Sequence, residues 1–143
     1  NTDITFNWER MLDFSGDSAP YLQYTYARLR SITRKSQMAN RKWFWGPKTY
    51  FSKLTGETEL RLMRKIFEFT EEIERSGKIL ETNNLANYLY KLASLVSGFY
   101  ETTPILKEKS ESRRNALLAL IDASASVLRS GLGLLGIKAP ERI

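Results

Sequence analysis

The amino-acid sequence predicts an all-α fold in which the helices pack as an antiparallel bundle. Four long stretches carry apolar residues at helical spacing, and short connections that contain Gly or Pro separate them. No stretch shows the strict alternation of apolar and polar residues that is typical of a half-buried strand. The chain has 143 residues, of which 42% are hydrophobic and 27% are charged. These values indicate one globular domain that is large enough to bury a sizeable core.

The first predicted helix covers about residues 20–39. Asp17 or Ser18 can cap its free amide groups, and Pro20 lies just inside, where a missing N–H costs nothing. Because each residue turns the helix by about 100°, two faces can be assigned. The face that is predicted to be buried contains Leu22, Tyr26 and Leu29. The other face carries aromatic and cationic side chains and contains Tyr21, Tyr24, Arg28, Ser31 and Lys35.

Residues 40–56 are predicted to be irregular, because Gly46–Pro47 breaks regular structure within this stretch. A second helix is expected over about residues 57–76. Glutamates at its N-terminal end complement the helix dipole, and Gly77 is expected to stop it. The apolar positions that recur at helical spacing in this stretch are Leu60, Met63, Phe67 and Ile73.

Two longer helices are predicted over about residues 83–100 and 110–130, with Pro104 in the connection. The buried stripe of the earlier helix is predicted to contain Leu85, Tyr88, Leu89, Leu92, Val96 and Phe99. The inward positions of the later helix are predicted to be Leu117, Leu120, Ile121, Ser124 and Leu128. Three glycines come after this helix rather than after a strand, so they indicate helix termination and a turn instead of a phosphate-binding loop. They are Gly131, Gly133 and Gly136.

Composition and spacing exclude several kinds of site. The chain has no Cys and no His, so disulfides, thiolate or imidazole metal sites and histidine-assisted nucleophiles are excluded. Glu71 and Glu72 are adjacent, and adjacent residues on a helix do not converge on one substrate. We therefore predict no catalytic residue, no metal and no cofactor within this stretch of sequence. No apolar run approaches the about 20 residues that span a bilayer, so no membrane partner is expected.

Basic and aromatic residues are concentrated near the first predicted helix. The chain has a net charge of +6, and there is no Asp or Glu between Ser18 and Gly56. The cations of this basic block are Arg28, Arg30, Arg34, Lys35, Arg41, Lys42, Lys48 and Lys53. Cations that meet phosphates, next to rings that stack on bases, are typical of a surface that binds single-stranded nucleic acid. Two alternatives stay open here: the tyrosines pack against another helix, or the basic face is solvated or meets an acidic protein.

Three segments of the chain resemble one known family, the arginyl-tRNA synthetases. Residues 16–28, GDSAPYLQYTYAR, resemble the family's GDTGPYLQYAHAR segment, and residues 86–92, ANYLYKL, resemble its ANYLYEL helix. Residues 127–143, VLRSGLGLLGIKAPERI, are similar to its terminal VLxxGLxLLGIxxPERM. The resemblance implies that residues 18–143 form the DALR domain, an all-α bundle that holds the anticodon stem-loop of tRNA(Arg). Residues 1–17 would be the tail of the catalytic domain or the connection from it.

The resemblance also implies which residues form the binding site. The family's positions around the anticodon loop match Tyr21, Tyr24, Arg28, Tyr88 and Ile143. For Tyr88, which lies on the predicted apolar stripe, packing in the core stays an equal alternative. The cations that we expect to meet the tRNA backbone are Arg30, Arg34, Lys35, Arg41 and Lys42.

For the full-length protein, the resemblance implies a class I arginine–tRNA ligase that uses ATP with Mg²⁺ in a catalytic domain before residue 1. A chain without His cannot contain the HIGH-type signature of that domain, so this fragment alone is expected to be non-catalytic. The expected partners are tRNA(Arg) and the catalytic domain, in the cytoplasm or in an organelle such as the mitochondrion. Two other functions compete with this one. They are a free-standing helical module that binds a protein through Trp43–Trp45, and a basic RNA-binding domain without anticodon preference.

Overall fold

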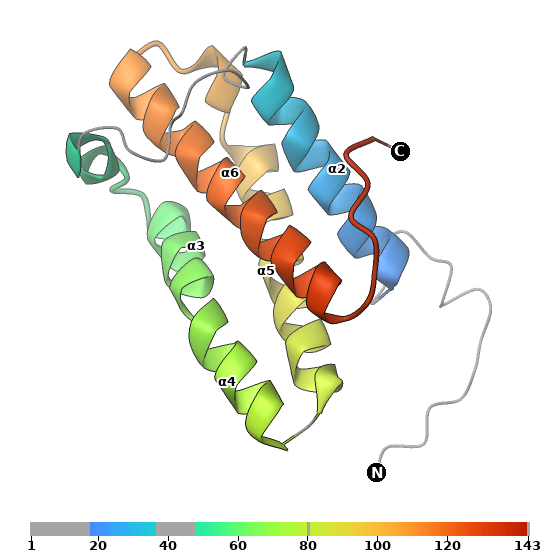
Figure 1. Cartoon of the computed structure of the whole chain (residues 1–143). Helices are drawn as coiled ribbons and strands as arrows, with labels where there is room; N and C mark the ends of the chain where they lie inside the picture. Colours follow the sequence, from blue (N-terminus) through green and yellow to red (C-terminus); the bar gives the residue numbers. More distant parts are fainter. Residues whose placement is uncertain (1–17, 37–47, 80, 143) are drawn as a thin grey trace.

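The computed structural model describes residues 18–36, 48–79 and 81–142, and the regular structure within these ranges is entirely helical. The elements are α2 (Ala19–Lys35), η3 (Lys48–Lys53), α3 (Glu57–Phe67), α4 (Phe69–Ile79), α5 (Thr82–Thr102), η4 (Ile105–Lys107) and α6 (Glu111–Leu134). Figure 1 shows α2 and α5 running in one direction and α3, α4 and α6 running in the other. The predicted all-α antiparallel bundle is confirmed.

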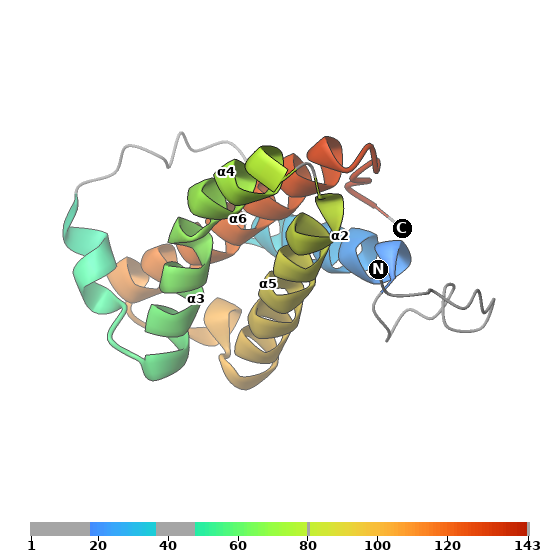
Figure 2. The same cartoon turned by 90° about the horizontal axis from the view of Figure 1, so that it is seen from below.

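Helix α6 is the central element of this bundle. It packs against α2, α3 and α5 and also contacts the short helices η3 and η4. Figures 1 and 2 show α2 on one side of α6 and α3 on the other. The buried stripes predicted for α5 and α6 are confirmed, since every residue in them is buried. The apolar pattern therefore predicts the core of these two helices well.

The second predicted helix is in fact two helices, because the helical backbone breaks at Glu68 between α3 and α4. The first turn of α3 is capped by Glu59, whose carboxylate accepts a hydrogen bond of 2.9 Å from the Gly56 amide. The expectation that Gly77 stops the helix is wrong, since α4 continues through Gly77 to Ile79. Glycine lowers helix propensity by about 1 kcal/mol, which does not oblige a helix to end.

The apolar face predicted for this region is also partly wrong. Leu60 and Phe67 are exposed, at 39% and 76%, whereas Leu62 is completely buried. Two neighbouring rows of side chains are both spaced as a helix requires, so periodicity alone does not choose between them. The row with Leu62 is the one that faces inward, and it includes Glu59, which is only 3% exposed. The Glu59 carboxylate lies 2.5 Å from the Arg113 guanidinium of α6, and this ion pair offsets the cost of burying the carboxylate.

The end of α6 differs from the prediction as well. Gly131 and Gly133 lie inside the helix and do not terminate it. Gly131 allows a close approach to α5, because a Cβ atom there would lie 2.3 Å from the Leu89 Cδ2 atom. The predicted turn is confirmed at Gly136, which has a φ of 72° and needs the freedom of glycine. The Ile137 amide donates to the Leu132 carbonyl at 2.9 Å, which closes the helix end and reverses the chain.

Helix α6 contains an 18-residue stretch with a mean hydropathy of 1.4, so by length and composition alone this helix could cross a membrane. Half of the apolar stretch is buried inside the bundle. A helix that packs on several sides needs apolar residues around much of its circumference, and α6 is such a helix. Its composition is therefore accounted for by its central position.

Candidate nucleic-acid interface

Helix α2 presents three different faces. Its start is fixed by Ser18, whose hydroxyl accepts a hydrogen bond of 3.4 Å from the Tyr21 amide, as predicted for a cap. The core face is buried, as predicted, and contains Leu22, Tyr26 and Leu29. A second face, which we call the outer face, is partly or fully exposed and contains Tyr24, Arg28 and Lys35. The third face contacts the C-terminal segment of the chain, which Figure 1 shows running beside α2, and contains Gln23, Arg30 and Arg34.

The two tyrosines predicted to stack on bases have different surroundings. Tyr24 is 46% exposed, so part of its ring is accessible to a base. The Tyr21 ring is partly buried, and its centroid lies 5.1 Å from that of Tyr90 on α5, with the planes tilted by 42°. Periodicity does not single out Tyr90, because residue 90 lies beside the apolar stripe of α5. Tyr24 is thus the accessible ring, and Tyr21 is tied to the bundle.

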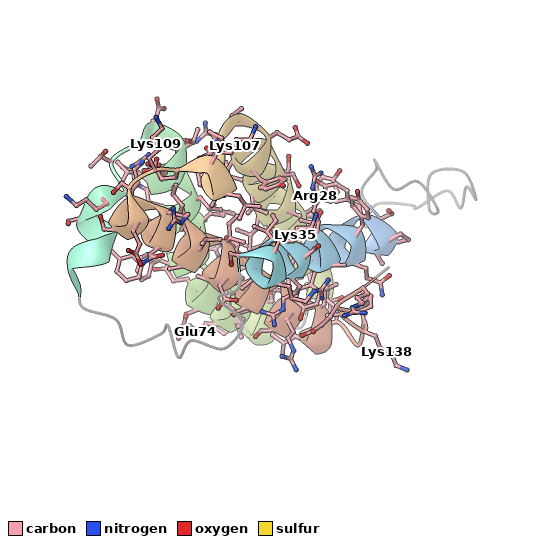
Figure 3. The ribbon with its side chains drawn as sticks, turned by 90° about the horizontal axis from the view of Figure 1, so that it is seen from above. Arg28, Lys35, Glu74, Lys107, Lys109 and Lys138 are labelled. Atoms are coloured by element: carbon pink, nitrogen blue, oxygen red, sulfur yellow. The ribbon has the colours of Figure 1, made fainter. Side chains whose placement is uncertain are left out.

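Arg28 lies on the outer face against the last turn of α5. Its guanidinium is 3.9 Å from the Glu101 carboxylate and 5.0 Å from the centre of the Tyr100 ring. The ring contact orients the planar guanidinium, whose side chain is 38% exposed. Figure 3 shows Arg28 on the side of α2 opposite Lys138. Arg28 is therefore held in one direction while part of its donor surface stays open.

Lys35, at the end of α2, is exposed, and no ion pair holds it within the described residues. Arg30 and Arg34, by contrast, are engaged by the protein itself. Arg30 donates to Asp122 at 3.1 Å and pairs with Glu141 at 3.4 Å, and Arg34 donates to the Glu141 carbonyl at 3.0 Å. The contacts of these arginines with a tRNA backbone stay a prediction, and such contacts would compete with the bonds just described.

In the folded protein, acidic side chains from other elements pair with cations of the basic block, so its local net charge is lower than the sequence alone suggests. No acid lies between Ser18 and Gly56, but distant elements supply acids to this block. Glu101 comes from α5, Asp122 from α6 and Glu141 from the C-terminal segment. The charge that remains without a partner among the described residues of α2 is concentrated at Lys35.

Tyr88 is buried, with 3% of its surface exposed, as its place on the apolar stripe predicts. Its hydroxyl donates to the Lys65 carbonyl at the end of α3, and its ring stacks with Phe69 at 5.8 Å between centroids. Burial raises the pKa of the Tyr88 phenol above its ordinary range, and the carboxylates of Glu68 and Glu72 raise it further. In this structure Tyr88 packs at the break between α3 and α4, and its contact with RNA stays a prediction.

Several predicted features lie outside the described residues. They are the connection at residues 1–17, the cations Arg41 and Lys42, the segment Trp43–Trp45, and Ile143. Within the ranges that the structure does describe, no group of three or more acidic side chains could hold a metal ion. A cavity of about 100 Å³ lies beside the Tyr21–Tyr90 pair, where α2, α5 and the C-terminal segment meet. Pockets for small molecules usually measure about 300 Å³ or more, so this region is better suited to contact a surface than to enclose a ligand.

Comparison with known proteins identifies the family. A family model described as the DALR anticodon binding domain matches residues 22–143, which is most of the chain. The chain belongs to this family. The match includes every element that the structure describes except the first turn of α2. The resemblance inferred from the sequence motifs is confirmed.

Curated relatives of this DALR domain are arginine–tRNA ligases. The chain is 45% identical to that of Thermococcus kodakarensis over 143 residues, which is 98% of the chain and 22% of the relative. It is 41% identical to that of Cellvibrio japonicus over 144 residues, which is 99% of the chain and 24% of the relative. The chain therefore spans about a quarter of the length of the relatives it matches.

Solved structures agree with this assignment. The arginyl-tRNA synthetase of Thermus thermophilus superimposes with a TM-score of 0.83 at 32% identity, covering 96% of the chain and 23% of that protein. The arginyl-tRNA synthetase of Plasmodium falciparum also gives 0.83, at 29% identity, covering 100% of the chain and 24% of that protein. The DALR domain is thus seen in these structures as part of a longer chain. A free-standing protein-binding module is not favoured by these matches.

Proposed function

We propose that this DALR domain binds the anticodon stem-loop of tRNA(Arg) as part of an arginine–tRNA ligase. The observation that carries the proposal is the outer face of α2, where an exposed ring, an oriented guanidinium and an exposed ammonium follow one another along the helix. Tyr24 offers a surface on which an unstacked base can lie. Arg28 offers planar donors for a base edge or a phosphate, and Lys35 offers a cation for the backbone.

In the full-length protein, the portion before this chain would carry out ATP-dependent arginylation of tRNA with Mg²⁺. The relatives that match are about four times as long and are named for this activity. The DALR domain would contribute selection of the tRNA, and its second partner would be the catalytic domain of the same protein. Cytoplasmic translation is the setting that this activity implies, and an organellar form would serve the same chemistry.

Binding to matched tRNAs tests the proposal directly. Every arginine anticodon has a central cytosine, so the probes are tRNA(Arg) and the same tRNA with only that base replaced. We expect the full protein to prefer the cognate tRNA by about tenfold or more, which corresponds to about 1.4 kcal/mol. Equal affinities at several salt concentrations would instead indicate a basic RNA-binding domain without anticodon preference. Absence of measurable binding to both tRNAs would contradict the proposal altogether.

A second experiment separates the roles of the two portions. The 143-residue chain by itself should not catalyse arginine-dependent ATP–pyrophosphate exchange. It has no histidine. Within the described ranges it also has no strand that leads through a glycine-rich loop into a helix, which is the usual way to bind a nucleotide phosphate. The full-length protein should catalyse this exchange. Exchange activity that purifies with the fragment would show that the assignment of catalysis to the preceding portion is wrong.

A further inference from the structure

The C-terminal segment, residues 137–142, runs along α2 after the turn at Gly136. Ile137 and Ala139 of the segment pack against the hydrophobic core, and polar contacts join the segment to α2. The Gln23 side chain donates to the Lys138 carbonyl at 2.7 Å, and the Arg34 guanidinium donates to the Glu141 carbonyl at 3.0 Å. The segment therefore follows the helix in the same direction over more than three turns, from residue 23 to residue 34.

Arg30 is the residue that joins this segment to the core of the bundle. One terminal nitrogen of its guanidinium lies 3.1 Å from an Asp122 oxygen on α6, and the other lies 3.4 Å from a Glu141 oxygen. A guanidinium has a rigid fork of donors, whereas a lysine ammonium is a single point of charge. Only a fork can reach two carboxylates on different elements in this way. Asp122 thus fixes the direction of Arg30, and Arg30 fixes Glu141.

The segment and the outer face lie along different sides of α2. Successive residues of a helix are about 100° apart, so Gln23 and Arg34, which hold the segment, are turned by this angle from Tyr24 and Lys35 on the outer face. A polynucleotide wide enough to reach across α2 from the outer face would meet residues 137–142. Because Glu141 occupies the guanidinium of Arg30, that cation is committed to the protein and is not available to a phosphate.

We propose that Arg30 is a positioning residue for RNA binding, which acts by locking residues 137–142 against α2 through Glu141. This inference rests on the proposed function, because the locked segment is inferred to form one edge of the tRNA-binding surface. It assigns Arg30 a role different from the direct backbone contact that its charge suggests. Simple electrostatics predicts that loss of the Glu141 carboxylate strengthens RNA binding, whereas the lock predicts that it weakens binding.

A double-mutant cycle on the full protein tests the lock. Arg30→Ala and Glu141→Ala should each weaken the affinity for tRNA(Arg), by roughly three- to tenfold for a partly exposed pair. The double variant should bind tRNA(Arg) no more weakly than whichever single variant has the lower affinity, because both changes release the same segment. Arg30→Lys keeps the charge but not the fork, and it should resemble Arg30→Ala. Additive losses, or tighter binding by Glu141→Ala, would overturn the proposal.

Release of the segment can be followed without RNA. Trypsin cleaves after Lys138, and mass spectrometry can measure how fast the peptide that ends there appears. Cleavage should be at least about threefold faster in Arg30→Ala and Glu141→Ala, as expected for loss of a partly exposed ion pair. Lys35→Ala, on the outer face, should weaken RNA binding without changing this rate. An unchanged rate in both lock variants would overturn the proposal.

Two controls keep the outcomes distinct. If Arg30→Ala does not fold, Glu141→Ala decides the question, because its side chain is more than half exposed and its loss leaves the core intact. If the wild-type protein does not prefer tRNA(Arg), the proposed function fails. If the wild type shows that preference and both Arg30→Ala and Glu141→Ala bind tRNA(Arg) with wild-type affinity, the proposed function stands and the positioning role of Arg30 fails.

Discussion

Tyr21 and Tyr24 lie three residues apart on α2, yet only one of them is accessible. The Tyr24→Ala variant should lose base stacking, which is worth about 1–3 kcal/mol, and should keep its thermal stability. Its ring is 46% exposed, so little packing is lost. Binding assays with tRNA(Arg) and thermal unfolding measure the two effects. The matched control is Tyr26→Ala, whose ring is 2% exposed and whose loss should cost about 3–5 kcal/mol of stability. If the Tyr24→Ala protein unfolds at a clearly lower temperature than the wild type, the Tyr24 ring belongs to the core.

Arg28 is the residue whose geometry best fits discrimination between RNAs. Replacing it with Lys keeps the charge near Glu101 but removes the planar donors above Tyr100. We expect Arg28→Lys to weaken binding to tRNA(Arg) and to narrow its preference over the tRNA with a replaced central base. The ratio of the two affinities is the measurement that matters. A constant ratio with both affinities reduced would mean that Arg28 binds only phosphate or Glu101.

Tyr88 links stability to pH. Burial raises the pKa of its phenol, so above about pH 10 the unfolded chain loses this proton while the folded protein keeps it. The unfolded state is then favoured, and stability falls as the pH rises through this range. Tyr88→Phe should lose about 0.5–1.5 kcal/mol at neutral pH with the hydrogen bond to Lys65, and its stability should decline less above about pH 10. Urea unfolding of both proteins at two pH values checks this, and parallel declines would contradict it.

How far a sequence predicts individual residues depends on where their partners lie. The buried positions Leu22, Tyr26 and Leu29 follow from spacing within one helix, and they are confirmed. The packing of Tyr21 depends on Tyr90, which lies more than sixty residues away in the chain. Likewise, no local pattern indicates that Glu141 neutralises Arg30. Spacing within one element therefore predicts burial, while the electrostatics of the site require the tertiary structure.

At the scale of elements, the buried faces of α2, α5 and α6 follow their patterns, and some ends do not. Helix α2 ends at Lys35 rather than near residue 39, and α6 continues to Leu134. The break between α3 and α4 is not predicted. The capping and apolar signals extend across Glu68 without interruption. Two contacts from distant elements hold the separate helices: Arg113 pairs with Glu59, and Tyr88 bonds to Lys65 at the break. Because both partners come from later in the sequence, single-helix periodicity cannot reveal the break.

Two glycines of α6 provide a matched test of the contact between α5 and α6. In Gly131→Ala, the new Cβ atom would lie 2.3 Å from a Leu89 side chain that is fully buried and cannot move aside. This variant should lose about 1–3 kcal/mol of stability through overpacking. At Gly133 no atom lies within 4 Å of a new Cβ atom, so Gly133→Ala should gain about 0.4–1 kcal/mol. Denaturant unfolding gives both values, and a stabilised Gly131→Ala protein would disprove the close approach.

For the whole molecule, binding should depend on salt less steeply than the basic block suggests. Each phosphate contact contributes a slope of about −0.7 for single strands in a plot of log affinity against log salt. Lys35→Ala should make the slope shallower by about this amount. Arg30→Ala should change it little, because Asp122 and Glu141 already neutralise that cation. Lys78→Ala, on α4, is the control. If Lys35→Ala and Lys78→Ala change the salt slope equally, the attraction between protein and RNA is diffuse and not concentrated at Lys35.

The central position of α6 has a consequence for hydrogen exchange. Amide protons exchange with solvent only when a helix opens, and α6 cannot open without separating α2, α3 and α5 from one another. Its amides should therefore be the slowest to exchange, at a rate set by global unfolding. Helix α4 has no buried residue and packs against α3 and α5, so it should exchange through local opening. Helix α2 packs on α6, whose amides are expected to exchange slowest. The surface inferred to meet RNA therefore belongs to the part of the protein that opens last.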